Sequence, residues 1–223
     1  MNKEAIYLYG FFQGRGLPLA MKAVTFAYQL HKGQARDDGV TPYSDHPITV
    51  ARLLINQNIT DDVTLAASLL HDTIDDKKAT YEEIKNEFGA EVADLVQVLA
   101  DKDLDRISKD IRAIIIKAAD RTYNIGTMVG IFNVARLEKY VLDTEEKILP
   151  MMKDARRKYL KYGDALVAFR DHIVNVIKVV KEVIRLSMEN EKLRAELGQG
   201  QVEKPRQMDL DMGNIPAQEE TES

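Results

Sequence analysis

Residues 67–76 read ASLLHDTIDD, an apolar segment that runs directly into one histidine and three aspartates. Side chains four positions apart share a helix face, so His71 would lie beside Asp75 and Asp72 beside Asp76. Three carboxylates this close repel one another, and burial increases the repulsion. A divalent cation is the simplest compensation. The alternative is an exposed acidic cluster that caps the following helix.

Two other segments offer ligands for such a cation. His46 precedes a proline that marks a helix start, and a neutral imidazole there can bind metal, although a lone histidine is more often a cap or a surface residue. Asp120 follows a largely apolar run, and a carboxylate at the end of such a run needs a partner, which Arg121 could also provide. The apolar residues of the run are Ile114, Ile115, Ile116, Ala118 and Ala119. Two hydrogen-bonding residues continue the helical face of Asp120 and could line a pocket: Asn124 and Thr127.

The spacing of apolar residues predicts an all-α protein. Apolar positions recur at helical intervals, and no segment has the two-residue period of a strand. We expect a compact multi-helix bundle with residues 1–16 as an N-terminal extension, 17–197 as the domain with a long C-terminal helix, and 198–223 as a disordered tail poor in large apolar residues. The expected helices cover 17–31, a segment from Pro47, 61–70, 80–89, 91–99, 108–128, 142–162 and 165–197.

Composition limits the partners and the kind of metal site. The net charge of −5 gives no general attraction to nucleic acid, so an anionic ligand needs a local cluster of Lys, Arg or metal. The chain has no cysteine, so metal ligands must be imidazoles and carboxylates. Without a signal-peptide pattern or an apolar stretch of membrane length, we expect a cytoplasmic protein with no membrane partner. The C-terminal helix leaves a homo-oligomer and an intramolecular role equally open.

Three segments together resemble the hydrolase domain of the RelA/SpoT proteins and their small stand-alone relatives, within the HD superfamily. They read HKGQARDDGVTPYSDHPITVA over 31–51, ASLLHDTIDD over 67–76 and KDIRAIIIKAADRTYN over 109–124. Their order and separation are those of the family, and the resemblance covers roughly residues 17–145. We expect the synthetase and regulatory domains of the long relatives to be absent.

The resemblance implies a metal-dependent hydrolase that removes the 3′-pyrophosphate from guanosine tetra- or pentaphosphate, ppGpp or pppGpp. The implied ion is manganese, which suits a ligand set of imidazoles and carboxylates. The implied metal ligands are His46, His71, Asp72 and Asp120. The implied acidic catalytic pair is Asp75 and Asp76. The implied nucleotide contacts are Arg36, Asn124 and Thr127, with Arg136 and Lys139 where the family carries basic residues. No role is assigned to His31, which is expected to close a helix end, or to His172.

Three positions depart from the family pattern. Asp75 replaces a glutamate, Lys77 replaces a small hydroxyl residue, and Asp37 stands where many relatives carry a second basic residue. A carboxylate at position 37 is expected to weaken the binding of a polyphosphate. The alternatives are therefore hydrolysis of an adenosine alarmone, NADPH or another nucleotide, and a non-catalytic nucleotide-binding module. A pure binder of polyanions gains nothing from so many carboxylates, which argues against the binding module.

Overall fold

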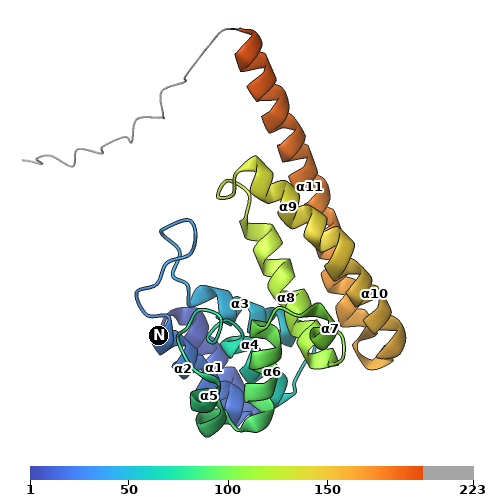
Figure 1. The fold of residues 1–223 in the computed structure, drawn as a ribbon. Coiled ribbons are helices and arrows are strands. Elements are labelled where there is room, and N and C mark those ends of the chain that lie inside the picture. Colours follow the sequence, from blue (N-terminus) through green and yellow to red (C-terminus); the bar gives the residue numbers. More distant parts are fainter. Residues whose placement is uncertain (198–223) are drawn as a thin grey trace, which may run out of the picture. The chain divides into compact units, whose positions relative to one another are not determined.

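The computed structural model describes residues 1–197, and within that range every regular element is a helix. The prediction of an all-α fold is confirmed, and the expected tail over 198–223 lies outside the described residues. The principal helices are α1 (Lys3–Arg15), α2 (Pro18–Leu30), α3 (Asp45–Asn56), α4 (Asp62–Leu70), α5 (Tyr81–Phe88), α6 (Ala90–Ala100), α7 (Leu104–Ile107), α8 (Ile111–Thr127), α9 (Val134–Asp143), α10 (Leu149–Lys158) and α11 (Gly163–Glu196). Figure 1 shows their order along the chain.

Helix α4 is the most apolar of the first six helices. Every residue of α4 from Thr64 to Leu70 is buried, and α4 lies against α2, α3, α6 and α8. Figure 1 shows α1 to α6 gathered in one region of the molecule, with α8 running from that group toward α9. The position of α4 matters for the site because its last residue directly precedes His71.

The N-terminal segment forms a helix that the sequence patterns did not predict. Asn2 caps α1 by accepting a hydrogen bond from the backbone N–H of Ala5, and Gly16 closes the helix in the left-handed conformation at φ 67°. Leu8 and Phe12 of α1 are fully buried, and α1 packs on α2. Residues 1–16, expected as an extension, therefore contribute to the hydrophobic core.

The helix expected from residue 142 begins earlier, at Val134, where the side chain of Asn133 caps α9. Between α9 and α10 the chain makes one π-helical turn, Thr144–Ile148, before Pro150. Proline lacks a backbone N–H, and the wider turn lets the helical path continue past it instead of breaking there.

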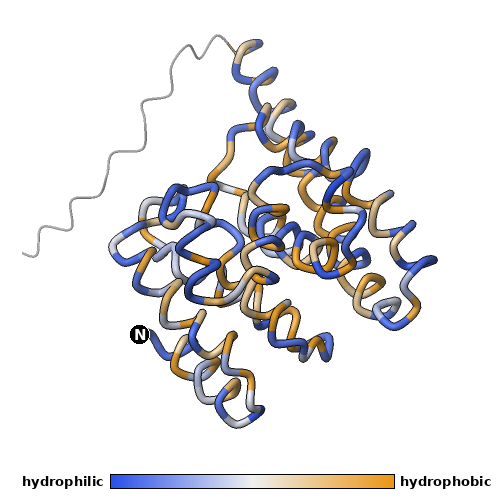
Figure 2. The backbone as a smooth tube through the Cα atoms, turned by 60° about the horizontal axis from the view of Figure 1, so that its bottom comes forward, coloured by the Kyte–Doolittle hydropathy of each residue, from blue (hydrophilic) through white to orange (hydrophobic). Residues whose placement is uncertain are grey.

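The helix α11 carries an apolar stripe on an otherwise polar surface. Its buried residues through Ile184 recur at three- to four-residue intervals, and Figure 2 shows hydrophobic and hydrophilic colours alternating along it. Residues 1–185 form one compact unit, and a second unit begins at Leu186 within the same helix. In the described part of the chain, no helix is both long enough and apolar enough to span a membrane.

Candidate metal centre and nucleotide pocket

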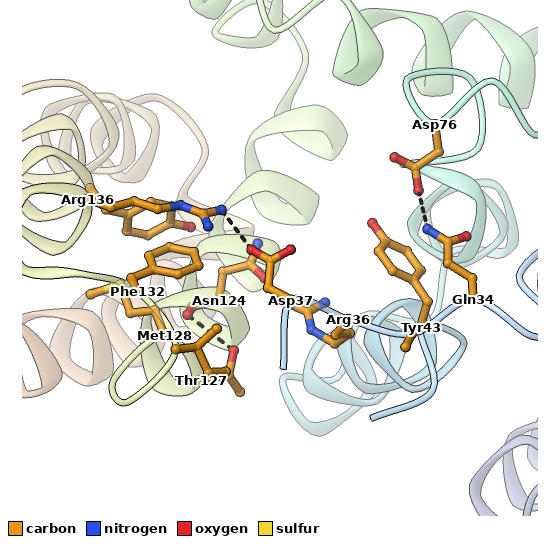
Figure 3. A pocket seen from close by; sticks show the side chains of 13 residues that line it. Gln34, Arg36, Asp37, Tyr43, Asp76, Asn124, Thr127, Met128, Phe132 and Arg136 are labelled. Atoms are coloured by element: carbon orange, nitrogen blue, oxygen red, sulfur yellow. Dashed lines mark hydrogen bonds and ion pairs between the residues drawn. The ribbon is translucent and has the colours of Figure 1, made fainter. Parts of the chain in front are cut away.

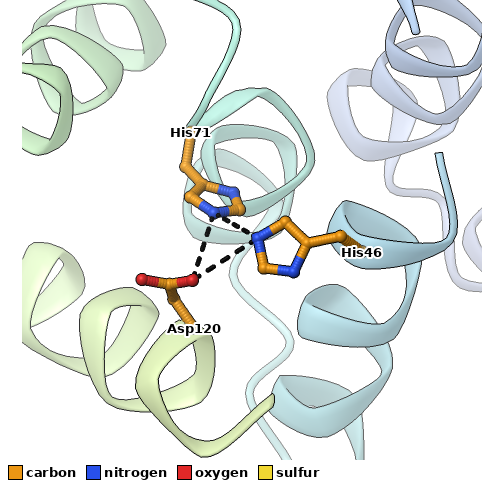
Figure 4. Close-up of side chains that lie close together, drawn as sticks. All are labelled: His46, His71 and Asp120. Carbon is orange, nitrogen blue, oxygen red and sulfur yellow. Dashed lines mark hydrogen bonds and ion pairs between the residues drawn. The ribbon is translucent and has the colours of Figure 1, made fainter. Parts of the chain in front are cut away.

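Three helices bring two imidazoles and one carboxylate together in the interior. His46 lies in the first turn of α3, His71 caps the end of α4, and Asp120 lies in the middle of α8. All three side chains are buried, and one ligand atom from each lies within 4.8 Å of the others (Figure 4). The two Nε2 atoms are 3.1 Å apart, and Oδ1 of Asp120 is 3.4 Å from Nε2 of His46.

Asp72 borders this three-residue cluster and contacts each imidazole through a different oxygen. Its Oδ2 lies 3.2 Å from Nε2 of His46, and its Oδ1 lies 3.3 Å from Nε2 of His71. Ligand atoms at about 2.1 Å from a common ion, at tetrahedral or octahedral angles, are separated by about 3.0–3.4 Å. The separations among His46, His71 and Asp120, the longest of which is 3.7 Å between Nε2 of His71 and Oδ1 of Asp120, are close to those that the ligands of a single divalent ion would have.

A hydrogen bond outside the cluster orients one of the imidazoles. Nδ1 of His71 lies 2.8 Å from the backbone carbonyl of Ser68, one turn earlier in α4. A carbonyl only accepts, so Nδ1 carries a proton and Nε2 faces the cluster. The end of α4 thus presents the nitrogen that a metal ion would need.

The electrostatics of the cluster favour a positive charge at its centre. Burial lowers the pKa of His71, but the carboxylates of Asp72 and Asp120 outweigh burial and raise that pKa to about 9. Burial raises the pKa of Asp120, but Lys117 and the two imidazoles hold it well below its usual range. Burial also raises the pKa of Asp72, but His71 and His46 lower it below its usual range. Both carboxylates are thus ionised, and the donor set fits a divalent cation.

His71 and Asp72, the HD doublet, lie in a turn over residues 71–77, called the HD turn below. This corrects the expectation that His71, Asp72 and the two following aspartates share one helix. Helix α4 ends at Leu70, and residues 71–77 form consecutive turns, with one helix-like hydrogen bond from the N–H of Asp76 to the carbonyl of Asp72. The chain then reverses at Lys77, whose φ is 55°. This path sends the two predicted catalytic aspartates to different neighbours.

Asp76 lines a pocket, whereas Asp75 pairs with a lysine. The carboxylate of Asp75 lies 2.6 Å from Nζ of Lys102, and Asp75 does not line the pocket. The carboxylate of Asp76 accepts a hydrogen bond of 3.3 Å from the side-chain amide of Gln34.

The pocket adjoins the candidate metal centre and has a volume of about 410 Å³ (Figure 3). It lies between the loop 31–44, the turn after His71, the end of α8 and the start of α9. Of the residues predicted to meet a nucleotide, the structure brings together Arg36, Asn124, Thr127 and Arg136. Lys139 lines a separate hollow beside Leu142 and Lys181, so the structure does not bring it to this pocket.

Two side chains connect the pocket with the cluster. The amide of Asn124 donates to Oδ1 of Asp120 at 2.6 Å, and its carbonyl accepts from Arg36 at 2.9 Å. The hydroxyl of Tyr43 donates to Oδ2 of Asp72 at 2.7 Å. Because Asn124 and Tyr43 line the pocket, a molecule bound there lies one side chain away from Asp120 and Asp72.

Comparison with known proteins places this arrangement in a family. Residues 23–109 match the model of the HD domain, a range that contains His46, His71 and Asp72. The guanosine-3′,5′-bis(diphosphate) 3′-pyrophosphohydrolase MESH1 of Xenopus tropicalis is 39% identical, over 48% of this chain and 68% of that protein. The chain belongs to the HD-domain family of MESH1 and SpoT.

The longer relatives contain much more than this HD domain. The bifunctional (p)ppGpp synthase/hydrolase SpoT of Escherichia coli is 31% identical, over 77% of this chain and 26% of SpoT. The chain therefore spans about a quarter of the length of that relative. A solved structure described as a metazoan ortholog of SpoT that hydrolyzes ppGpp has the same fold, with a TM-score of 0.57 and 24% identity over 72% of this chain and 94% of that one.

The HD domain also uses residues that the sequence patterns did not single out. Tyr43 and Gln34 contact the aspartates of the HD turn, and Lys102 pairs with Asp75. Tyr43 and Gln34 stand in the same segment as Arg36, but nothing in their spacing shows which way they point. Lys102 follows α6 and is adjacent to the site only through the packing of α6 on α4.

Proposed function

We propose that this chain is a metal-dependent phosphohydrolase that removes the 3′-pyrophosphate of guanosine 3′,5′-bis(diphosphate). The observation that carries the proposal is the buried cluster of His46, His71 and Asp120, connected through Asn124 to a pocket lined by Arg36 and Arg136. The printed activities of MESH1 and SpoT support the same substrate.

The proposed metal ligands are His46, His71, Asp72 and Asp120. These residues would hold a divalent ion, which would supply polarisation of a phosphoryl oxygen and a lowered pKa of a water molecule. We propose manganese, because two imidazole ligands suit it better than magnesium, which prefers oxygen ligands and water.

The pocket residues bind the substrate and accept the proton of the attacking water. Arg36 and Arg136 neutralise phosphate charge through their guanidinium groups, and Asn124 and Thr127 orient the nucleotide by hydrogen bonds. Asp76 accepts the proton of the attacking water, because it is the carboxylate that borders both the HD turn and the pocket. Asp75 is a weaker candidate for accepting the proton, and Lys139 is a weaker candidate for binding phosphate, because neither residue lines the pocket.

The reaction proposed is a hydrolysis with simple products. The oxygen of water forms a bond to the phosphorus attached to the 3′ oxygen, and the bond between that phosphorus and the 3′ oxygen breaks. Pyrophosphate leaves, the 3′ oxygen gains a proton, and the nucleoside 5′-diphosphate remains.

The experiment is a product assay with the purified full chain. Guanosine tetraphosphate with manganese should yield GDP and pyrophosphate in equal amounts, and a His71→Ala variant should yield neither. The adenosine counterpart and NADPH serve as competing substrates. Turnover of one of these without turnover of guanosine tetraphosphate would replace the proposed substrate, and turnover of none would favour a binding module.

A further inference from the structure

A third histidine lies behind the proposed site, outside the metal cluster. His31 caps the end of α2 and is 2% exposed. Its Nδ1 lies 2.9 Å from the side-chain carbonyl oxygen of Gln34, and its ring stacks on Tyr43 at a centroid distance of 4.6 Å and an interplanar angle of 26°. Gln34 donates a hydrogen bond to Asp76, and Tyr43 donates one to Asp72. His31 therefore supports both of these contacts.

The chemistry of the donors decides how this arrangement is oriented. The carboxylate of Asp76 only accepts hydrogen bonds, so Gln34 must present its amide N–H to Asp76. The carbonyl oxygen of Gln34 then faces His31, whose Nδ1 must carry the proton. Burial lowers the pKa of His31, so its ring is neutral near pH 7 and has a single N–H, which this bond uses.

The backbone holds the same three residues together. The N–H of Gln34 donates to the carbonyl of His31 at 3.1 Å, and the N–H of Tyr43 donates to the carbonyl of Gln34 at 2.8 Å. The loop between Gln34 and Tyr43 is thus closed at its base. The side chain of Gln34 is oriented instead by its two hydrogen bonds, one with Nδ1 of His31 and one with the carboxylate of Asp76.

We propose that His31 is a positioning residue: its Nδ1–H fixes the amide of Gln34 so that the amide donates to Asp76, while its ring supports Tyr43 against Asp72. This inference rests on the proposed role of Asp76 in hydrolysis. Without the donor, the carbonyl oxygen of Gln34 loses its hydrogen bond to His31, and the amide is held in place by its 3.3 Å contact with Asp76 without the second anchor, so Asp76 loses a fixed partner. A displaced Asp76 carboxylate should reduce turnover by about tenfold to a hundredfold.

The first test is His31→Phe, which keeps a flat ring against Tyr43 and removes the N–H donor. We expect kcat for guanosine tetraphosphate to fall about tenfold or more, with KM within about twofold and with unchanged metal content. His172→Phe is the matched control, because His172 is an exposed histidine on α11. A wild-type kcat in His31→Phe would overturn the inference.

A double-mutant cycle distinguishes positioning from general destabilisation. Gln34→Leu removes the intermediary, so adding His31→Phe should lower kcat by less than about a further twofold. If the loss of kcat in the double variant equals the product of the losses in the two single variants, His31 does not act through Gln34. Should His31→Phe fail to fold, Gln34→Glu tests the same contact from a partly exposed position: it still accepts from His31, cannot donate to Asp76 when ionised, and should show the same selective loss of kcat.

The tautomer of His31 provides a readout that does not depend on activity. Long-range proton–nitrogen NMR spectra of the full chain with magnesium should show His31 protonated at Nδ1, with its signals assigned by their loss in His31→Phe. The side-chain amide signals of Gln34, absent in Gln34→Leu, should move in His31→Phe. Protonation of His31 at Nε2 alone would overturn the inference. If the wild-type chain does not hydrolyse guanosine tetraphosphate, the proposed function fails, whereas these signals still decide whether His31 orients Gln34.

Discussion

Arg136 and Asp37 form an ion pair between α9 and the loop 31–44, with 2.8 Å between a guanidinium nitrogen and a carboxylate oxygen. Both residues line the pocket, and both side chains are more than half exposed. The guanidinium of Arg136 also lies 3.4 Å from the centroid of the Phe132 ring. The departure noted at position 37 thus has a structural consequence, because a phosphate that binds Arg136 must compete with a carboxylate of the protein.

Replacing that carboxylate should improve substrate binding. Asp37→Asn removes the competing charge, and an exposed ion pair contributes up to about 1 kcal/mol, so we expect KM for guanosine tetraphosphate to fall by about twofold to fivefold with kcat little changed. Steady-state kinetics at low and high salt test this, since screening should shrink the difference. Asp154→Asn, an exposed change outside the pocket, is the control. An unchanged KM at low salt would show that the pair does not obstruct the phosphate.

Metal removal should affect stability as well as activity. A chelator should abolish hydrolysis, and manganese should restore it better than magnesium. Because an ion that binds only the folded state stabilises it, manganese should also raise Tm in the wild-type chain and not in His46→Ala. Full activity in excess chelator, or an equal shift of Tm in His46→Ala, would contradict the assigned ligands.

The two aspartates of the HD turn should differ in importance. Asp76→Asn should lower kcat by about a hundredfold or more, on the usual scale for a positioned acid–base group, while manganese binding persists. Asp75→Asn should cost less, because Asp75 pairs with Lys102 and does not line the pocket. Measuring kcat and bound manganese for both variants tests this order. A larger loss in Asp75→Asn would exchange their roles.

The helix α1 should be essential to the stability of the HD domain. Phe12→Ala removes a fully buried ring and should lower the free energy of unfolding by about 3–5 kcal/mol. Tyr7→Ala on the same helix is the control, since Tyr7 is 60% exposed and its loss should cost about 0.5 kcal/mol or less. Urea unfolding measures both. Equal midpoints for the two variants would show that α1 is not part of the core.

Helix ends were predictable where a side chain closes its own helix. Thr80 and Glu83 have capping-box spacing, and α5 begins with both reciprocal hydrogen bonds in place. The start of α9 was missed, although Asn133 caps it, because the apolar pattern there is short. The turn after Leu70 could not be predicted from the sequence. The four-residue spacing of His71 and Asp75, and of Asp72 and Asp76, is the same whether the segment forms a helix or a series of turns.

The sequence by itself determined the all-α class and the residue types of the candidate centre. Helical periodicity and caps are local, and a chain without cysteine leaves histidine and carboxylate as metal ligands. The family resemblance implied that His46, His71 and Asp120 meet, and the structure brings them together. Only the tertiary structure decided that Asp76 rather than Asp75 borders the pocket and that His31 lies behind Gln34. These relationships depend on how α2, α3, α4 and α8 pack on one another. Packing brings together residues that are far apart in the sequence, and their separation along the chain does not reveal their distance in space.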